Sequence, residues 1–308
     1  MIDTKPILVT GSHRSGSTWV GKMLATSPSV NYIHEPFNGM CRPGICSSKF
    51  PYTFMYITEA NESNYYNSVK DILQFSYNFE AETKTIKTLK DIARMYRDYM
   101  ICKKNKLLNV TPLIKDPMAI FSAEWLANKF DMNVLILVRH PASFVSSCKQ
   151  LGWGFDFSHL LKQKLLIKDY LYLFETEIND YASKEHDLID KCALLWKIIY
   201  YVVKQYRQKY NGWLFVKYED ICENPLKVFE SIFQKTKIKY TRSSIKVINK
   251  YTFYPYYKGI KEETHSVKRH SKLYKEIWKY RLTKPEITRI RNQVESISQE
   301  FYSSSDWN

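Results

Sequence analysis

A stretch of small and polar residues near the N-terminus has the spacing of a phosphate-binding loop. Residues 11–18 read Gly-Ser-His-Arg-Ser-Gly-Ser-Thr and follow an apolar run at residues 7–10. A strand that turns into a helix through such a loop directs backbone N–H groups and a helix N-terminus at an anion. The ATP-binding pattern G-x-x-x-x-G-K-[ST] has Lys where this chain has Ser17, and the cation here is Arg14. The loop therefore predicts a phosphate site without the usual Mg-ATP chemistry.

A second cation follows another apolar run. Residues 133–138 read Asn-Val-Leu-Ile-Leu-Val and lead directly into Arg139, where an Asp that holds Mg²⁺ would be expected in an ATP-hydrolysing enzyme. Two cations at two strand ends describe a site for a ligand with two separate phosphate groups and no metal ion. 3′-Phosphoadenosine 5′-phosphosulfate (PAPS) is such a ligand.

Three segments resemble the PAPS-dependent sulfotransferase family. Residues 14–19 (RSGSTW) resemble the loop for the 5′-phosphosulfate, in the Arg-containing form of the carbohydrate and tyrosyl-protein branches. Residues 139–147 (RHPASFVSS) resemble the motif for the 3′-phosphate, and residues 218–220 (YED) resemble a more distant family segment. The resemblance implies metal-independent, in-line transfer of a sulfuryl group from PAPS to an acceptor hydroxyl, with adenosine 3′,5′-bisphosphate as the product.

The resemblance also implies roles for individual residues. Arg14 would contact the 5′-phosphate and the leaving oxygen, and Arg139 with Ser147 would hold the 3′-phosphate. In the family a basic loop closes over the nucleotide, and Arg269 in the basic segment 258–284 is the candidate for that contact. The residues expected to bind PAPS are Arg14, Ser15, Gly16, Ser17, Thr18, Trp19, Arg139, Ser147 and Arg269.

An acceptor hydroxyl needs a base, because an alcohol is a poor nucleophile until its proton begins to leave. Glu35 follows the second expected strand, and residues 34–37 (HEPF) resemble the Glu-Pro segment of carbohydrate sulfotransferases, where the Glu is the base. Glu35 is therefore the expected catalytic base, with His34 as the rival. Lys115 could reach the phosphosulfate or the acceptor, or could form a structural pair with Asp116.

Alternating strands and helices predict an α/β fold, a P-loop-like three-layer α/β/α sandwich around a mainly parallel sheet of about five strands. No linker or repeat is evident, so residues 1–308 are expected to form a single sulfotransferase domain. The expected strands are 7–10, 30–34, 107–114, 134–138 and 214–217. The expected helices include 17–26, 65–79, 85–102, 119–128, 142–150, 160–181, 184–209, 225–235 and 284–298. Such sheets bind ligands at the carboxyl ends of their strands.

The chain carries 46 Lys and Arg against 31 Asp and Glu in 308 residues, a net charge of +15. This charge implies an anionic partner, such as PAPS, an acidic polysaccharide or an anionic membrane surface. No nucleic-acid-binding motif is evident, so no nucleic-acid partner is expected. No signal peptide is recognisable, the apolar run 193–203 is too short to span a bilayer, and the six cysteines form no secreted framework. A cytoplasmic location is therefore expected.

Several alternatives remain at the level of sequence. A P-loop nucleotide or small-molecule kinase is disfavoured by Ser17 and by the missing Asp after the strand 134–138. A non-enzymatic binder of nucleic acid or acidic polymer would leave the two loops unexplained. The spacing of Cys41 and Cys46 allows a disulfide or a metal, but no second ligand pair follows, so no metal site is expected. The Glu-Pro segment favours a saccharide or glycolipid acceptor over a peptide tyrosine, and the aromatic residues 151–157 and 251–257 could form an acceptor surface.

Overall fold

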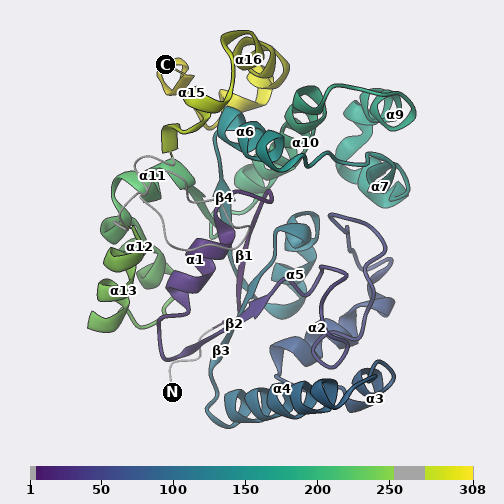
Figure 1. Ribbon diagram of the computed structural model, residues 1–308, viewed down its shortest axis with the longest axis vertical. Coiled ribbons are helices and arrows are strands. Elements are labelled where there is room, and N and C mark those ends of the chain that lie inside the picture. The colour runs from purple at the N-terminus through teal and green to yellow at the C-terminus, as the bar shows by residue number, and fades with distance from the viewer. Residues whose placement is uncertain (1–4, 253–274, 308) are drawn as a thin grey trace.

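The computed structural model describes residues 5–252 and 275–307, and in this part of the chain five parallel strands form one central sheet in the order β2-β3-β1-β4-β5. Figure 1 shows the sheet at the centre of the molecule. The strands are β1 (Ile7–Gly11), β2 (Val30–His34), β3 (Thr111–Lys115), β4 (Asn133–Val138) and β5 (Leu214–Lys217). The predicted α/β class and strand number are confirmed.

Helices cover both faces of this sheet. The α-helices are α1 (Ser17–Leu24), α2 (Tyr66–Leu73), α3 (Phe79–Thr83), α4 (Leu89–Leu107), α5 (Ala123–Phe130), α6 (Pro141–Leu151), α7 (Ser158–Leu161), α8 (Lys164–Leu166), α9 (Glu175–Ser183), α10 (Leu188–Lys209), α11 (Tyr218–Glu223), α12 (Pro225–Lys235), α13 (Arg242–Thr252), α15 (Trp278–Arg281) and α16 (Lys284–Ser298). Shorter 3-10 turns are η1 (Glu62–Asn64), η2 (Pro117–Ser122), η4 (Tyr172–Phe174) and η5 (Ser304–Trp307), and η3 (Ile167–Leu171) is a π-helical turn.

The strands alternate their side chains between two apolar clusters, which is why both faces are buried. Ile7 and Val9 pack with α1, α11 and α12 on one face, whereas Leu8 packs on the other face with α5, α6 and α10. In Figure 1 the helices α1, α11, α12 and α13 lie together on one side of the strands, and α5 and α10 lie on the other. This is the three-layer sandwich that the sequence predicts.

Local sequence explains several element boundaries. Thr283 caps α16 by accepting a hydrogen bond from the Glu286 N–H at 3.4 Å, and Glu286 returns a carboxylate oxygen to the Thr283 N–H at 2.8 Å. This capping box, with Pro285 in the first turn, confirms the predicted start of the helix.

Several predicted elements differ from the structure in their bounds, including the helices 65–79, 85–102 and 119–128, which are observed as α2, α4 and α5. Two further differences have an identifiable cause. The expected strand 107–114 begins only at Thr111, because α4 continues to Leu107 through a run of lysines that favours helix. The expected helix 160–181 is broken into α7, α8, η3, η4 and α9. Its interruption near Gln163 has a tertiary cause, since the Gln163 side chain accepts from the Tyr56 N–H and donates to the Phe54 carbonyl.

Candidate active site

A cavity of about 550 Å³ lies where β1, β2, β3 and β4 end, and we call it the strand-end cavity. The predicted residues Arg14, Glu35 and Arg139 all line it, although they come from three separate loops. Its lining also includes His13, Gly16, Ser17, Thr18, Asn38, Met40, Thr53, Phe54, Pro117, Met118, Trp153, Gly154, Phe155, Asp156 and His159. Parallel strands place their carboxyl ends at one edge, so the fold brings these loops together.

The loop between β1 and α1 has the form that an anion site needs. Gly16 caps α1 with φ of 93°, in the left-handed region that favours glycine. A Cβ on Gly16 would lie 2.6 Å from the Tyr218 ring, so a larger residue would also displace that ring. The Ser15 hydroxyl is buried and has no hydrogen-bond partner among the described residues. Ser17 and Thr18, in the first turn of α1, add backbone N–H groups at the helix N-terminus.

The two arginines are held by serines of α6. Arg14 donates from Nε to Ser147 Oγ at 2.8 Å, and Arg139 donates from Nε to Ser143 Oγ at 2.9 Å. Arg139 also donates to the Arg14 carbonyl, and its guanidinium lies 4.8 Å from the centroid of the Tyr218 ring. Ser147 therefore contacts Arg14, and Ser143 contacts Arg139. The expected contact of Arg139 and Ser147 with a shared 3′-phosphate stays a prediction.

Glu35 forms a buried ion pair with Lys115. The Lys115 ammonium, fully buried behind the cavity wall, donates to one carboxylate oxygen, and Asn38 Nδ2 donates to the other at 3.1 Å. Burial alone would raise the pKa of Glu35, but the Lys115 charge and these hydrogen bonds outweigh it and lower that pKa. Burial lowers the pKa of Lys115 as well, against the opposing effect of Glu35. Glu35 is consequently a carboxylate at neutral pH.

Lys115 does not pair with its neighbour Asp116. The Asp116 carboxylate accepts instead from the backbone N–H groups of Phe37 at 2.6 Å and Met118 at 2.8 Å. Burial raises the pKa of Asp116 to about 7 despite these hydrogen bonds. Asp116 thus ties the segment after Glu35 to the start of η2, which fixes the position of Glu35.

Other predicted residues lie outside the cavity lining. His34 lines a different cavity, together with Tyr32, and its Nδ1 lies 3.0 Å from the Tyr32 hydroxyl. The Trp19 indole is buried against Tyr218 and Phe229 and does not line the cavity. Only the backbone N–H of Trp19 remains as a candidate donor to an anion at the start of α1. Arg269 lies outside the described residues.

Three of the residues that line this cavity have a strained backbone. Seven non-glycine residues have positive φ in residues 5–252 and 275–307, and Arg14 (62°), Glu35 (45°) and Phe54 (58°) all line the strand-end cavity. A bulky residue adopts this conformation only where its surroundings enforce it, and such strain clusters at functional sites. Phe54 is fully buried, and its carbonyl accepts a hydrogen bond from the Gln163 side-chain amide at 3.3 Å.

Several lining residues were not expected to be functional. His13 lies in the loop beside Arg14, and burial, reinforced by the Arg14 charge, lowers its pKa to about 4. His159 accepts the Thr53 N–H at Nδ1 over 2.9 Å, so its Nε2 carries the proton when the ring is neutral. Only the aromatic segment 151–157 gave a signal in the sequence, and Trp153 and Phe155 do line the cavity.

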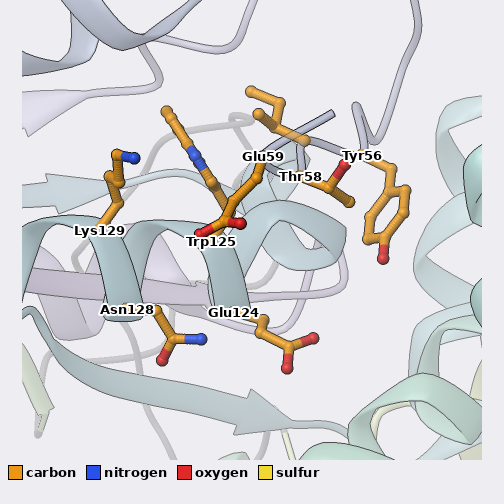
Figure 2. Close-up of a pocket in the computed structure, with 8 residues that line it drawn as sticks. Tyr56, Thr58, Glu59, Glu124, Trp125, Asn128 and Lys129 are labelled. Carbon is orange, nitrogen blue, oxygen red and sulfur yellow. The ribbon is translucent and has the colours of Figure 1, made fainter. Parts of the chain in front are cut away.

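A smaller cavity of about 220 Å³ lies beside α5, and three of its polar side chains bond to residues around it. Figure 2 shows Glu124 and Asn128 projecting from one side of α5 and Trp125 and Lys129 from the other. Glu124 accepts from Lys209, Tyr170 and Tyr210, and Lys129 and the Trp125 indole both donate to Glu62. These pairings describe a structural network rather than a site that awaits a ligand.

A family model described as "Sulfotransferase family" matches residues 6–242, which is more than three quarters of the chain. The chain belongs to the sulfotransferase family. Its members use PAPS as the co-substrate, and the match does not favour the kinase alternative.

Solved structures similar to this sulfotransferase share little sequence with it. The sulfotransferase domain from the curacin biosynthetic pathway is 13% identical, with a TM-score of 0.49, over 95% of this chain and 98% of that chain. The sulfotransferase domain of the Synechococcus PCC 7002 olefin synthase is 14% identical, with a TM-score of 0.47, over 98% of both chains. Sulfotransferase STF9 from Mycobacterium avium is 12% identical, with a TM-score of 0.47, over 97% of this chain and 77% of that chain. No curated protein matches.

The cysteines form no disulfide in this structure. Cys148 Sγ lies 3.5 Å from Nε2 of His13, which lines the strand-end cavity. Burial raises the pKa of Cys41 to about 11 and that of Cys46 to about 12. In the part of the chain that the structure describes, no group of His, Cys, Asp or Glu side chains has the arrangement of a metal site. Within the same residues, every helix is too short or too polar to cross a bilayer.

Proposed function

We propose that this sulfotransferase moves the sulfuryl group of PAPS to a hydroxyl of a saccharide or glycolipid, with Glu35 as the general base. The observation that carries the proposal is the convergence of Arg14, Glu35 and Arg139 on one cavity at the strand ends. A carboxylate and two guanidinium groups are the charges that the transfer of a sulfuryl group from one oxygen to another needs.

The residues of the strand-end cavity fit PAPS. The unpartnered Ser15 hydroxyl, the left-handed Gly16 and the N-terminus of α1 form a cradle for an anionic group. Arg139 lies at the end of β4 with its guanidinium oriented by Ser143. When bound, PAPS supplies the sulfuryl group and a phosphate leaving group. The expected contacts of Arg14, Ser15, Gly16, Ser17, Thr18, Trp19, Arg139, Ser147 and Arg269 with it stay predictions.

The roles of the chain's own residues follow from charge balance. Glu35 accepts the proton of the acceptor hydroxyl while the new O–S bond forms, and Arg14 stabilises the negative charge on the phosphate oxygen whose bond to sulfur breaks. Ser147 orients the Arg14 guanidinium through the 2.8 Å hydrogen bond to Nε. Lys115 is a positioning residue, because it holds the Glu35 carboxylate ionised and in place.

The cavity wall supports a sugar acceptor. Trp153 and Phe155 present aromatic rings to the strand-end cavity, and the Trp153 side chain is partly exposed. Aromatic rings provide apolar faces with polar rims that suit sugar rings. A glycolipid would be met at a membrane surface, and the net charge of +15 supports contact with anionic lipid. A single domain over residues 1–308 and a cytoplasmic location also stay predictions.

The test is a transfer assay with ³⁵S-labelled PAPS and a panel of saccharides, glycolipids and tyrosine peptides, in the presence of EDTA. We expect a labelled saccharide or glycolipid product. Glu35→Gln is expected to lower kcat by about 10²- to 10⁴-fold, the usual contribution of a general base, while binding of adenosine 3′,5′-bisphosphate is retained.

Glu59→Gln is the matched control, because Glu59 is an exposed carboxylate beside the smaller α5 cavity and not in the strand-end cavity. Glu59→Gln should leave kcat unchanged. A near-normal kcat for Glu35→Gln would remove Glu35 as the base, and labelling of tyrosine peptides alone would overturn the proposed acceptor.

A further inference from the structure

Helix α4 carries an apolar stripe that faces outward. Leu89, Ile92, Tyr96, Met100 and Leu107 are all exposed, and their spacings of three, four, four and seven residues place them on one side of a helix. The exposed fractions of Leu89 and Leu107 are 84% and 83%. Half of the fourteen large apolar side chains that are exposed in the described residues lie between positions 89 and 108.

The two buried residues of α4 are polar. These residues, Asp98 and Asn105, lie on the side of the helix opposite the stripe. Asp98 accepts from Arg42 at 2.9 Å, and Tyr99 beside it packs against Phe79 with ring centroids 4.8 Å apart, so both contacts anchor the helix. A helix on the surface of a globular protein ordinarily turns its apolar stripe to the core, so α4 has the reverse orientation.

Cations lie on both flanks of the apolar stripe. Helix α4 contains six Lys or Arg residues and two Asp residues, a net charge of +4. Lys90 and Lys104 fall on one flank and Lys103 and Lys106 on the other. All four are exposed, and none forms an ion pair within residues 5–252 and 275–307. In Figure 1 this helix lies along the lower border of the molecule, away from α6, α10 and α16.

We infer that α4 docks this sulfotransferase on a membrane surface that carries anionic headgroups. Exposed apolar residues along one face, an aromatic residue among them and lysines beside them are the features of a helix that lies in the plane of a bilayer interface. The lysines would meet the phosphates while Leu89, Met100 and Leu107 enter the acyl boundary. A second copy of the chain is a poor occupant, because two such helices would bring their positive charges together.

This inference locates the membrane contact named under the proposed function, but it does not depend on the acceptor or on Glu35. The test uses the full chain in flotation assays with vesicles of one part phosphatidylglycerol to two parts phosphatidylcholine, and with vesicles of phosphatidylcholine alone. We expect the protein to float with the anionic vesicles, to float poorly with the neutral ones, and to be released by salt.

Three variants locate the contact. The charge variant combines Lys90→Gln, Lys103→Gln, Lys104→Gln and Lys106→Gln. The stripe variant combines Leu89→Gln, Ile92→Gln, Met100→Gln and Leu107→Gln. The control removes the same charge from α12, α13 and the turn between them by Lys235→Gln, Lys239→Gln, Lys246→Gln and Lys250→Gln, all exposed positions.

The charge and stripe variants should each bind anionic vesicles at least about tenfold more weakly than the wild type, and the control should stay within about twofold. Glutamine was chosen because it favours the helical conformation, so α4 should be preserved. Binding of adenosine 3′,5′-bisphosphate checks that each variant is folded. Equal losses in the control and the charge variant would mean that net charge alone drives binding, and would overturn the assignment to α4. Failure of the wild type to float, or a wild-type dimer that the stripe variant converts to a monomer, would also overturn it.

Discussion

In the strand-end cavity each guanidinium donates to a serine of α6, whereas the lysines of α4 make no ion pair in the described chain. Both regions are cationic, but they use charge differently. Arg14 and Arg139 are fixed in direction by short hydrogen bonds in a partly dry site, which suits one ligand of defined shape. The α4 lysines are exposed on flexible side chains, which suits a diffuse layer of negative charge. The positive charge of the chain is therefore divided between two fixed guanidinium groups at the strand ends and a set of exposed lysines on α4.

The largest expected effect separates the two kinds of cation directly. Arg14→Ala should lower kcat/KM for sulfuryl transfer by about 10²- to 10³-fold, because a preorganised charge at the leaving oxygen is lost. Arg94→Ala on α4 removes the same charge from an exposed position and should leave kcat/KM unchanged. The rate of label transfer from PAPS, measured at saturating and at limiting acceptor concentrations, gives kcat/KM for both variants. Equal losses in the two variants would mean that the enzyme depends on total charge, and the contrast would fail.

The next effect concerns the buried histidine that follows Arg139 in the chain. His140 is buried against Trp278 with neither ring nitrogen bonded in the described residues, and burial lowers its pKa from 6.5 to about 3. The unfolded chain therefore binds this proton more readily, so His140 contributes stability above pH 6.5 that is lost as pH falls. At pH 5 the loss is about 2 kcal/mol.

Chemical denaturation between pH 7 and pH 5 measures this loss of unfolding free energy. His140→Phe keeps an aromatic ring beside Trp278 but cannot ionise, so its stability should vary less over that range. Parallel pH profiles for the wild type and His140→Phe would show that the ring is not buried neutral.

A smaller effect is expected from salt, which should weaken ligand binding to the two cationic regions to different extents. Raising NaCl from about 0.05 M to about 0.5 M shortens the screening length and should weaken binding to anionic vesicles by about tenfold or more. Binding of adenosine 3′,5′-bisphosphate should fall less, because buried or partly buried pairs are screened less than exposed ones. Calorimetry measures nucleotide binding and flotation measures vesicle binding at each salt concentration. An equal dependence of the two affinities on salt would show that both regions act as diffuse charge.

The smallest effect is a displacement of the pH profile. Lys115→Met removes the charge that lowers the pKa of Glu35, and burial would then raise that pKa. The acid limb of kcat/KM, which reports the protonation of Glu35, should move up by about one pH unit or more. Nucleotide binding confirms that the variant is folded. An acid limb that stays in place would mean that Lys115 does not set the ionisation of Glu35.

Local patterns carried much of the prediction. The apolar run 134–138 and the loop 11–18 were recognisable because a buried parallel strand and a phosphate loop each have a short sequence signature. The capping box at Thr283 marked the start of α16 for the same reason. The strand 107–114 and the helix 160–181 were misjudged, because α4 extends over a lysine-rich run and Gln163 bonds to a distant segment.

Pairings at the site could not be predicted in the same way. The Glu35–Lys115 ion pair joins residues 80 positions apart, and the Arg14–Ser147 hydrogen bond joins residues 133 apart. The sequence indicated that Arg139 and Ser147 share a ligand, but the direction of each arginine depends on which serine of α6 faces it. Thr53, Phe54 and His159 gave no signal at all, since they reach the cavity only through the packing of loops.

The amino-acid sequence by itself determined the strand and loop identities, the two arginines at strand ends, the carboxylate after the second strand and the positive charge of the chain. These are properties of short segments, in which residue type and spacing are sufficient. Tertiary structure alone decided that three loops form one cavity, that Lys115 pairs with Glu35, and that the apolar side of α4 faces outward. The reason is that a contact between distant segments depends on how all the intervening elements pack, which no local pattern encodes.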